Sequence, residues 1–169
     1  MSRRLAYADP PYIGRAHYYD HPDAKRWNTA PAHIELMTWM DAEFDGWALS
    51  CSSPSLVELL PGAPERVRVA AWVKTFAPGR RGQRVQYRWE PVLFRAPAIE
   101  RPGDPYCRDW TASHLMPAGK VQGLVGAKPE DFVRWMLSLL GWQPGDEVCD
   151  LFPGTGTVER VLLQGALFG

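Results

Sequence analysis

Short apolar runs alternate along this chain with stripes of apolar residues at helical spacing. A run of about four to eight apolar residues between turn residues is typical of a strand, and an apolar residue at about every third or fourth position is typical of an amphipathic helix. The strands that we expect are residues 5–8, 47–51, 66–73, 89–94 and 147–152. The helices that we expect run from Asn28 or Thr29 to Phe44, from Ser53 to Leu60, from Pro129 to Leu140, and from Thr157 onward. This alternation predicts an α/β fold with an open, mostly parallel sheet, which binds ligands at the carboxyl ends of its strands.

Residues 96–127 show no strong period and hold several glycines and prolines. We expect this segment to be a long loop, and long loops in compact domains usually contact a partner or a ligand. The whole chain has 169 residues, and a domain usually has roughly 100 to 200. The sequence therefore predicts a single domain.

The composition narrows the class of protein. The 19 Lys and Arg residues balance the 19 Asp and Glu residues, which excludes a polycationic tail and requires that any nucleic-acid contact come from a local basic patch. A hydrophobic content of 46% predicts a globular chain. The three cysteines, Cys51, Cys107 and Cys149, lie far apart and include no C-x-x-C pair, which excludes a disulfide framework and a thiolate zinc site. We therefore expect a reducing, cytoplasmic location.

The sequence also argues against a membrane segment and a metal site. No apolar stretch is long enough to cross a bilayer, and Asp9 and two prolines interrupt the N-terminal run before a signal-peptide core could form. His17 and His21 stand at helical spacing, but no third ligand is evident. We expect a soluble protein that has no contact with membranes and holds no metal.

A glycine-rich turn, residues 150–157 (Asp-Leu-Phe-Pro-Gly-Thr-Gly-Thr), lies between the last expected strand and the last expected helix. Gly154 and Gly156 let the backbone approach a ligand closely, and unpaired N–H groups at the start of a helix favour a negatively charged group. The turn lacks the third glycine of the dinucleotide-binding fingerprint, since Glu159 stands there, and it lacks the lysine of a phosphate-binding loop. It is therefore either a site for a carboxylate or phosphate, or a connecting turn whose glycines serve only its geometry.

A second candidate site, Asp9-Pro10-Pro11-Tyr12, follows the first expected strand. The prolines end the strand, stiffen the turn and leave carbonyl groups free without adding donors. The Asp9 carboxylate and the Pro10 carbonyl can both accept hydrogen bonds from an aromatic NH₂ group, which localises its lone pair and helps to remove a proton. Tyr12 offers an aromatic face on which a base can stack. The alternative is an ordinary surface turn, because Asp before Pro commonly starts one.

These two segments resemble motifs of the amino-group DNA methyltransferases. Residues 9–12 resemble motif IV, the catalytic motif, and residues 150–157 resemble motif I, which binds S-adenosylmethionine (SAM). Three further segments agree in order, since residues 47–53 resemble motif VI, residues 89–94 motif VIII, and residues 128–132 motif X. The order of the motifs, catalytic first and cofactor last, resembles the permuted β class of the family.

The resemblance implies a Rossmann-like, SAM-dependent methyltransferase fold with permuted motif order. It divides the single domain, residues 1–169, into a catalytic-motif half (1–95), a reduced target-recognition loop (96–127) and a cofactor-binding half (128–169). The implied reaction is transfer of a methyl group from SAM to the N6 amine of adenine in DNA, with the base flipped out of the helix. The implied setting is DNA methylation, as in restriction-modification systems.

The resemblance also implies roles for individual residues. Asp9 and the Pro10 carbonyl hold the target amine, Pro11 completes the rigid turn, and Tyr12 stacks on the flipped base. The residues expected around SAM are Lys128, Pro129, Asp150, Phe152, Gly154, Gly156 and Thr157.

A basic segment is the best candidate for a contact with DNA outside the reaction centre. Arg80, Arg81 and Arg84 lie together between two expected strands and can contact phosphates. The alternative is an exposed hairpin tip that is merely solvated.

The chain departs from the family after motif I. The family usually continues with two more strands, whereas here only residues 158–167 follow as one helix. The strand before the glycine-rich turn then becomes a sheet edge, which a second copy of the chain or a partner subunit can cover. A carboxylate for the ribose hydroxyls, expected about 20 residues past the glycines, is also missing.

Two other functions therefore stay open. One is transfer to the N4 amine of cytosine, because Asp before Pro-Pro-Tyr favours adenine only imperfectly. The other is a catalytically silent remnant of the family that binds nucleic acid or forms part of a larger assembly.

Overall fold

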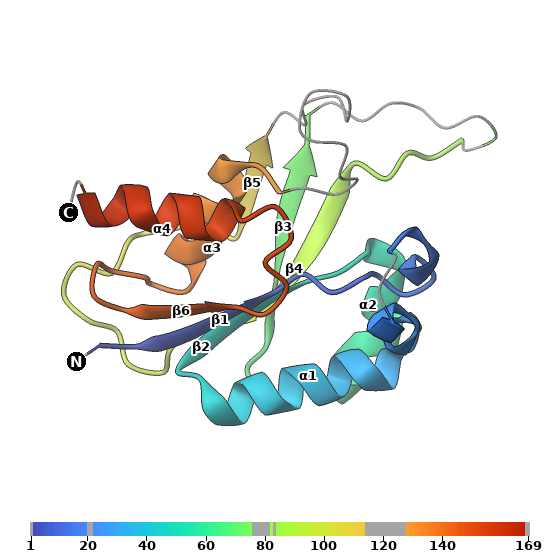
Figure 1. Cartoon of the computed structure of the whole chain (residues 1–169), viewed down its shortest axis with the longest axis horizontal. Helices are drawn as coiled ribbons and strands as arrows, with labels where there is room; N and C mark the ends of the chain where they lie inside the picture. The colour runs from blue at the N-terminus through green and yellow to red at the C-terminus, as the bar shows by residue number, and fades with distance from the viewer. Residues whose placement is uncertain (1, 20–21, 76–81, 83, 114–127, 168–169) are drawn as a thin grey trace.

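Figure 1 shows the computed structural model of the chain, which describes residues 2–19, 22–75, 82, 84–113 and 128–167. Its six strands form one sheet in the order β5-β3-β4-β2-β1-β6. The strands are β1 (Arg4–Ala8), β2 (Gly46–Ser50), β3 (Arg68–Lys74), β4 (Trp89–Arg95), β5 (Trp110–Ser113) and β6 (Glu147–Asp150). All of them run in the same direction except β4, which is antiparallel to its neighbours β2 and β3. The expected mostly parallel α/β sheet is confirmed.

Helices cover both faces of the sheet (Figure 1). α3 (Glu130–Leu139) and α4 (Thr157–Leu167) lie on one face, and α1 (Ala30–Glu43) and the short α2 (Leu56–Leu59) lie on the other. Short 3-10 turns at Ala16–Tyr18, Pro22–Asn28, Ser53–Ser55 and Leu60–Gly62 join these elements. None of the described helices is long and apolar enough to span a membrane.

The two layers of the core follow from the alternation of side chains along the strands. In β1, Leu5 and Tyr7 belong to the core beneath α3 and α4, whereas Ala6 and Ala8 belong to the core beneath α1. Both faces of this strand are buried, which explains why its sequence after Arg4 has no polar side chain facing solvent. The strand that precedes the Asp-Pro-Pro-Tyr turn is therefore held rigidly from both sides.

The carboxyl ends of three neighbouring strands meet at one edge of the sheet. β1 lies between β2 and β6 and is parallel to both, with Ala8 in register with Leu49 and Tyr7 in register with Asp150. The N–H of Leu151 donates to the carbonyl of Tyr7 at 2.9 Å. The turn at residues 9–12 and the turn at residues 150–157 therefore begin side by side, although they are far apart in the sequence.

The expected strands and helices are all present, with bounds shifted by three residues or fewer. Two corrections concern the segment that leads to α3. β5 lies in residues 96–127, where we expected only a loop; its four residues hold no apolar run, and it is fixed by pairing with β3 and by a hydrogen bond from Trp72 Nε1 to Ser113 Oγ at 2.5 Å. Pro129 is the residue before α3 rather than its first residue.

β6 occupies one end of the sheet, and within the described part of the chain it pairs with β1 alone. The expectation that the strand before the glycine-rich turn lies at a sheet edge is therefore confirmed. The expectation that a second copy or a partner covers this edge stays a prediction.

A network of arginines and aspartates joins the amino ends of β1 and β6. Asp146 accepts hydrogen bonds from the backbone N–H groups of Arg3 and Gln143, both at 2.9 Å, and from the Arg101 guanidinium at 2.8 Å. Asp104 accepts both Nη groups of Arg3 at 2.8 Å. The side chain of Asp146 is only 2% exposed. These charges fix the two strands relative to each other at the end opposite the candidate site.

Candidate active site

The Asp-Pro-Pro-Tyr turn stands at the carboxyl end of β1. Pro10 and Pro11 are buried and Asp9 and Tyr12 are half-buried, so the turn is part of the packed structure and not a loop in solvent. The N–H of Arg15 donates to the carbonyl of Tyr12 at 2.8 Å, which closes the chain after the turn. The interpretation as an ordinary surface turn does not fit this burial.

Lys128 is bound to the carboxylate of Asp9. Its Nζ lies 2.8 Å from both Asp9 oxygens and 3.2 Å from the hydroxyl of Tyr12. The Lys128 side chain is 8% exposed and that of Asp9 is 22% exposed. An ammonium group thus occupies both oxygens of the carboxylate that we expect to receive the target amine.

Glu90 on β4 completes the cluster on the other side of Lys128. The Tyr12 hydroxyl donates to Glu90 Oε2 at 2.8 Å, and Lys128 Nζ lies 3.7 Å from the same oxygen. The other oxygen of Glu90 pairs with Lys74 at the end of β3. Asp9, Tyr12, Lys74, Glu90 and Lys128, here called the charge cluster, contain two carboxylates and two ammonium groups.

Aromatic rings surround the Lys128 ammonium. Its Nζ lies 5.4 Å from the centre of the Tyr12 ring, 5.7 Å from that of Trp72 and 5.8 Å from that of Phe132. Such cation–π contacts stabilise a cation in a site that holds little water. The ring centres of Trp72 and Phe132 lie 5.0 Å apart, so the two rings form a packed apolar wall beside the carboxylates.

The buried charges shift one another's pKa values. Burial raises the pKa of Asp9, and the Lys128 ammonium opposes that rise. Burial alone would lower the pKa of Lys128, but Asp9 and Glu90 raise it above its ordinary value. Burial alone would raise the pKa of Glu90, but Lys128 and Lys74 lower it. The cluster therefore favours a charged ammonium between the two acids.

The glycine-rich turn connects β6 to α4. Gly154 and Gly156 have φ values of 45° and 67°, which residues with a side chain rarely adopt, and the N–H of Gly156 donates to the carbonyl of Pro153 at 2.7 Å. A Cβ at Gly154 or Gly156 would meet no atom of the described chain closer than 3.6 Å. A Cβ at either glycine would thus make only ordinary van der Waals contacts, and the α4 helix begins directly after them at Thr157.

Arg160, which the sequence did not single out, folds back over this turn. Its guanidinium donates to the carbonyl of Thr155 at 2.8 Å and to the hydroxyl of Thr157 at 3.0 Å. It adds a positive charge to the amino end of α4, where unpaired N–H groups already favour an anion.

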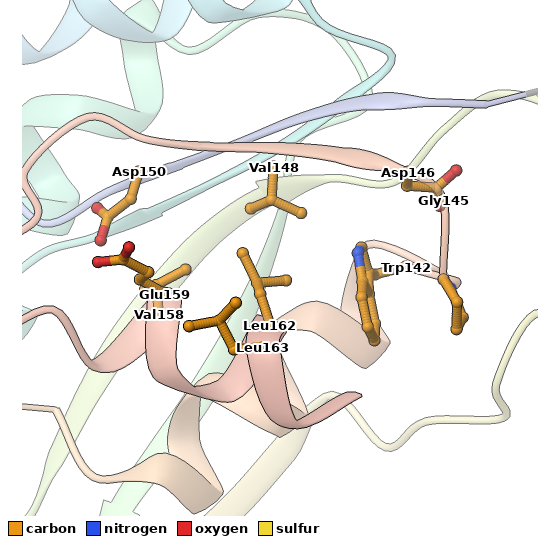
Figure 2. Close-up of a pocket in the computed structure, with 10 residues that line it drawn as sticks. Trp142, Gly145, Asp146, Val148, Asp150, Val158, Glu159, Leu162 and Leu163 are labelled. Carbon is orange, nitrogen blue, oxygen red and sulfur yellow. The ribbon is translucent and has the colours of Figure 1, made fainter. Parts of the chain in front are cut away.

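A groove of about 380 Å³ lies between β6 and α4 (Figure 2). Trp142, Val148 and Leu162 give it an apolar floor. Figure 2 shows Asp150 and Glu159 at one end of the groove, with their carboxyl groups turned toward each other. Burial raises the pKa of Asp150, and the nearby carboxylate of Asp9 raises it further. The groove therefore runs along β6, from Gly145 and Asp146 before its amino end to Asp150 at its carboxyl end.

The structure brings together most of the candidate residues that it describes. Asp9, Tyr12 and Lys128 are in direct contact, and the turn that holds Asp150, Phe152, Gly154, Gly156 and Thr157 begins beside them. Arg84 is exposed, while Arg80 and Arg81 lie outside the described residues. The sequence did not single out Glu90, Lys74 or Trp72; the one signal for Glu90 is an acidic side chain inside a strand whose other residues before Arg95 are apolar.

Comparison with known proteins finds solved structures with a similar fold. No family model matches the sequence, and no curated protein matches it. The crystal structure of a complex of M1.HpyAVI with SAM is 16% identical, with a TM-score of 0.64, over 98% of this chain and 79% of that chain. A crystal structure of M1.HpyAVI is 17% identical, with a TM-score of 0.59, over 98% of this chain and 78% of that chain.

The fold is that of the SAM-dependent methyltransferases, as the sequence predicted. M1.HpyAVI, whose structure this chain resembles, is a DNA methyltransferase. At 16% identity the likeness establishes the fold alone.

Proposed function

We propose that this chain transfers a methyl group from SAM to an exocyclic amine of a base in DNA, and that the amine is N6 of adenine. The observation that carries the proposal is the meeting of two turns at one sheet edge. The Asp-Pro-Pro-Tyr turn ends β1, the glycine-rich turn ends the parallel neighbour β6, and Leu151 of the second turn is hydrogen-bonded to Tyr7 beside the first. An acceptor for an amine and a place for a cofactor are thereby side by side.

The Asp-Pro-Pro-Tyr turn suits the chemistry of an aromatic amine. The lone pair of such an amine is delocalised into the ring, so the amine is a poor nucleophile. Acceptance of its two N–H bonds by Asp9 and by the Pro10 carbonyl favours a tetrahedral nitrogen and draws a proton away. Stacking on Tyr12 holds the base, which has to leave the DNA helix to reach a site this deep.

The glycine-rich turn fits the methionine part of SAM. Gly154 and Gly156 have no side chain to keep a ligand away from the backbone, and the amino end of α4 with Arg160 supplies the donors and positive charge that a carboxylate needs. Asp150, Phe152 and Thr157 lie on the same turn, and Pro129 at the start of α3 is the proposed contact from the other side. SAM supplies the methyl group on a sulfonium centre, and these residues bind and orient it.

The decisive experiment is incubation of unmethylated genomic DNA with the purified chain and methyl-labelled SAM, followed by analysis of the nucleosides. We expect label in N6-methyladenine. Label in N4-methylcytosine would select the alternative amine, and absence of label at every base would identify a silent remnant. Asp9 variants described below serve as the negative control.

Substitution of Gly156 tests the cofactor turn. Gly156→Ala is expected to weaken SAM binding about tenfold, because a side chain strains a residue at φ 67° and intrudes where the backbone meets the ligand. Gly145→Ala is the matched control: its φ is 95°, a Cβ there meets no atom within 4 Å, and it lies at the other end of β6. Calorimetric titration measures the affinity of each variant for SAM. Equal affinities would show that Gly156 does not lie at the SAM site.

Substitution of the basic segment tests the contact with DNA. Joint replacement of Arg80, Arg81 and Arg84 by Gln should weaken binding to all sequences alike and make the salt dependence shallower. Each neutralised phosphate contributes roughly −0.9 to the slope of log K against log salt, so the slope should change by up to about 2.7. Fluorescence anisotropy at several salt concentrations measures this slope. An unchanged slope would show that the three arginines are exposed to solvent and do not contact phosphates.

A further inference from the structure

We propose that the Lys128 ammonium is a placeholder for the target amine: it occupies Asp9 until the base arrives and then passes to Glu90. Glu90 is in this view a positioning residue that receives the displaced ammonium. The inference rests on the proposed function, since it concerns the same site. It assigns a role to two side chains, Lys74 and Glu90, that the Asp-Pro-Pro-Tyr turn alone does not explain.

The placement of Lys128 on Asp9 matches what an incoming amine requires. Its nitrogen lies 2.8 Å from each carboxylate oxygen, which is the distance at which an exocyclic amine would donate. The carboxylate can accept more than one donor, but the ammonium bound to both oxygens makes it a weaker proton acceptor. Asp9 can therefore draw a proton from the amine effectively only after the ammonium moves. Burial of the carboxylate beside the rings of Trp72 and Phe132 also costs less free energy when the ammonium neutralises it than when it is unpaired.

Glu90 lies where the ammonium can go. Lys128 Nζ is already 3.7 Å from Glu90 Oε2, so a shift of about 1 Å brings it to hydrogen-bond distance. Lys74 holds the other oxygen, and the Tyr12 hydroxyl donates to Oε2 at 2.8 Å, which keeps this oxygen turned toward Lys128. The ring of Tyr12 lies over the ammonium as well, so the cation stays within contact of an aromatic face during a short shift.

The test removes the charge of the receiving group. Glu90→Gln preserves the size of the side chain but no longer offers a carboxylate, so displacement of Lys128 from Asp9 becomes less favourable. We expect kcat for methyl transfer to unmethylated genomic DNA to fall about tenfold, the typical loss when a neutral group replaces a charged acceptor. KM for DNA and the affinity for SAM should stay within about twofold, because Glu90 acts on Lys128 and its partners, Tyr12, Lys74 and Lys128, do not belong to the cofactor turn.

Glu90→Gln in a chain that lacks the Lys128 ammonium shows whether Glu90 receives that ammonium or only supports the fold. In a Lys128→Met background, with Lys128→Gln as a second background, Glu90→Gln should change kcat by less than about twofold. A tenfold loss in both backgrounds, or no loss in the native background, would overturn the placeholder role while leaving the proposed function intact. Absence of methyl transfer by the unaltered chain would overturn both. Glu35→Gln is the control, since it removes a carboxylate from an exposed ion pair with Arg26.

Discussion

Replacement of Asp9 by Asn is expected to lower kcat by about 10²- to 10⁴-fold and to leave the affinity for SAM within about threefold. The range is that of a positioned acid–base group. Asn keeps the shape of the side chain, but one of its two acceptors becomes a donor, so it can no longer draw a proton from the amine. The cofactor turn is untouched, because it is held by Asp150, Gly156 and the start of α4. Initial rates with labelled SAM, together with calorimetric titration of SAM, measure both quantities.

Asp109→Asn is the matched control for this experiment. Asp109 lies before β5 in an exposed ion pair with Arg68, and loss of its charge should leave kcat unchanged within about twofold. Turnover of the Asp9 variant at the native rate would show that the amine is not held by this carboxylate. A parallel loss of SAM binding would mean that Asp9 supports the cofactor turn instead.

Much of the fold was predictable because most elements carry their own local signal. α1 has a proline near its start and apolar residues at helical spacing, and β1 and β2 are apolar runs that end at turn residues. β5 carries no such signal: it has four residues, and its partner β3 lies about 40 positions earlier. Its existence depends on tertiary pairing, which a local pattern does not contain.

The candidate site was predictable in its turns but not in its contacts. The two turns have short sequences with a clear chemical meaning, and strand order then places them together. The bond between Lys128 and Asp9 joins residues 119 positions apart, and the Tyr12–Glu90 bond joins residues 78 apart. The resemblance of residues 128–132 to motif X predicted a contact with the cofactor. The structure shows instead that Lys128 binds the carboxylate of Asp9 in the Asp-Pro-Pro-Tyr turn. Only the packing of α3 against β3 and β4 reveals that pairing.

Asp146→Asn is expected to lower the free energy of unfolding at neutral pH by about 2 to 3 kcal/mol, because buried donors lose a charged acceptor. Burial alone would raise the pKa of Asp146, but the Arg101 guanidinium and the N–H groups of Arg3 and Gln143 lower it to about 2. An unfolded Asp has a pKa of about 3.9, so the unfolded chain binds more protons between these values. The carboxylate therefore contributes its stability above about pH 4 and loses it as the pH falls toward 2.

The difference between the native chain and the Asp146→Asn variant should accordingly shrink in acid, to about half at pH 3. Urea unfolding of both chains at pH 7 and pH 3 measures this difference in the free energy of unfolding. Both chains contain Asp104, whose pKa is also lowered by Arg3, so its acid sensitivity cancels when one free energy is subtracted from the other. Glu147→Gln provides the control, because the neighbouring Glu147 pairs with Arg4 on the surface and should contribute no more than about 0.5 kcal/mol. A loss for Asp146→Asn that is the same at both pH values would show that the packing of residue 146, and not its charge, holds the amino ends of β1 and β6 together.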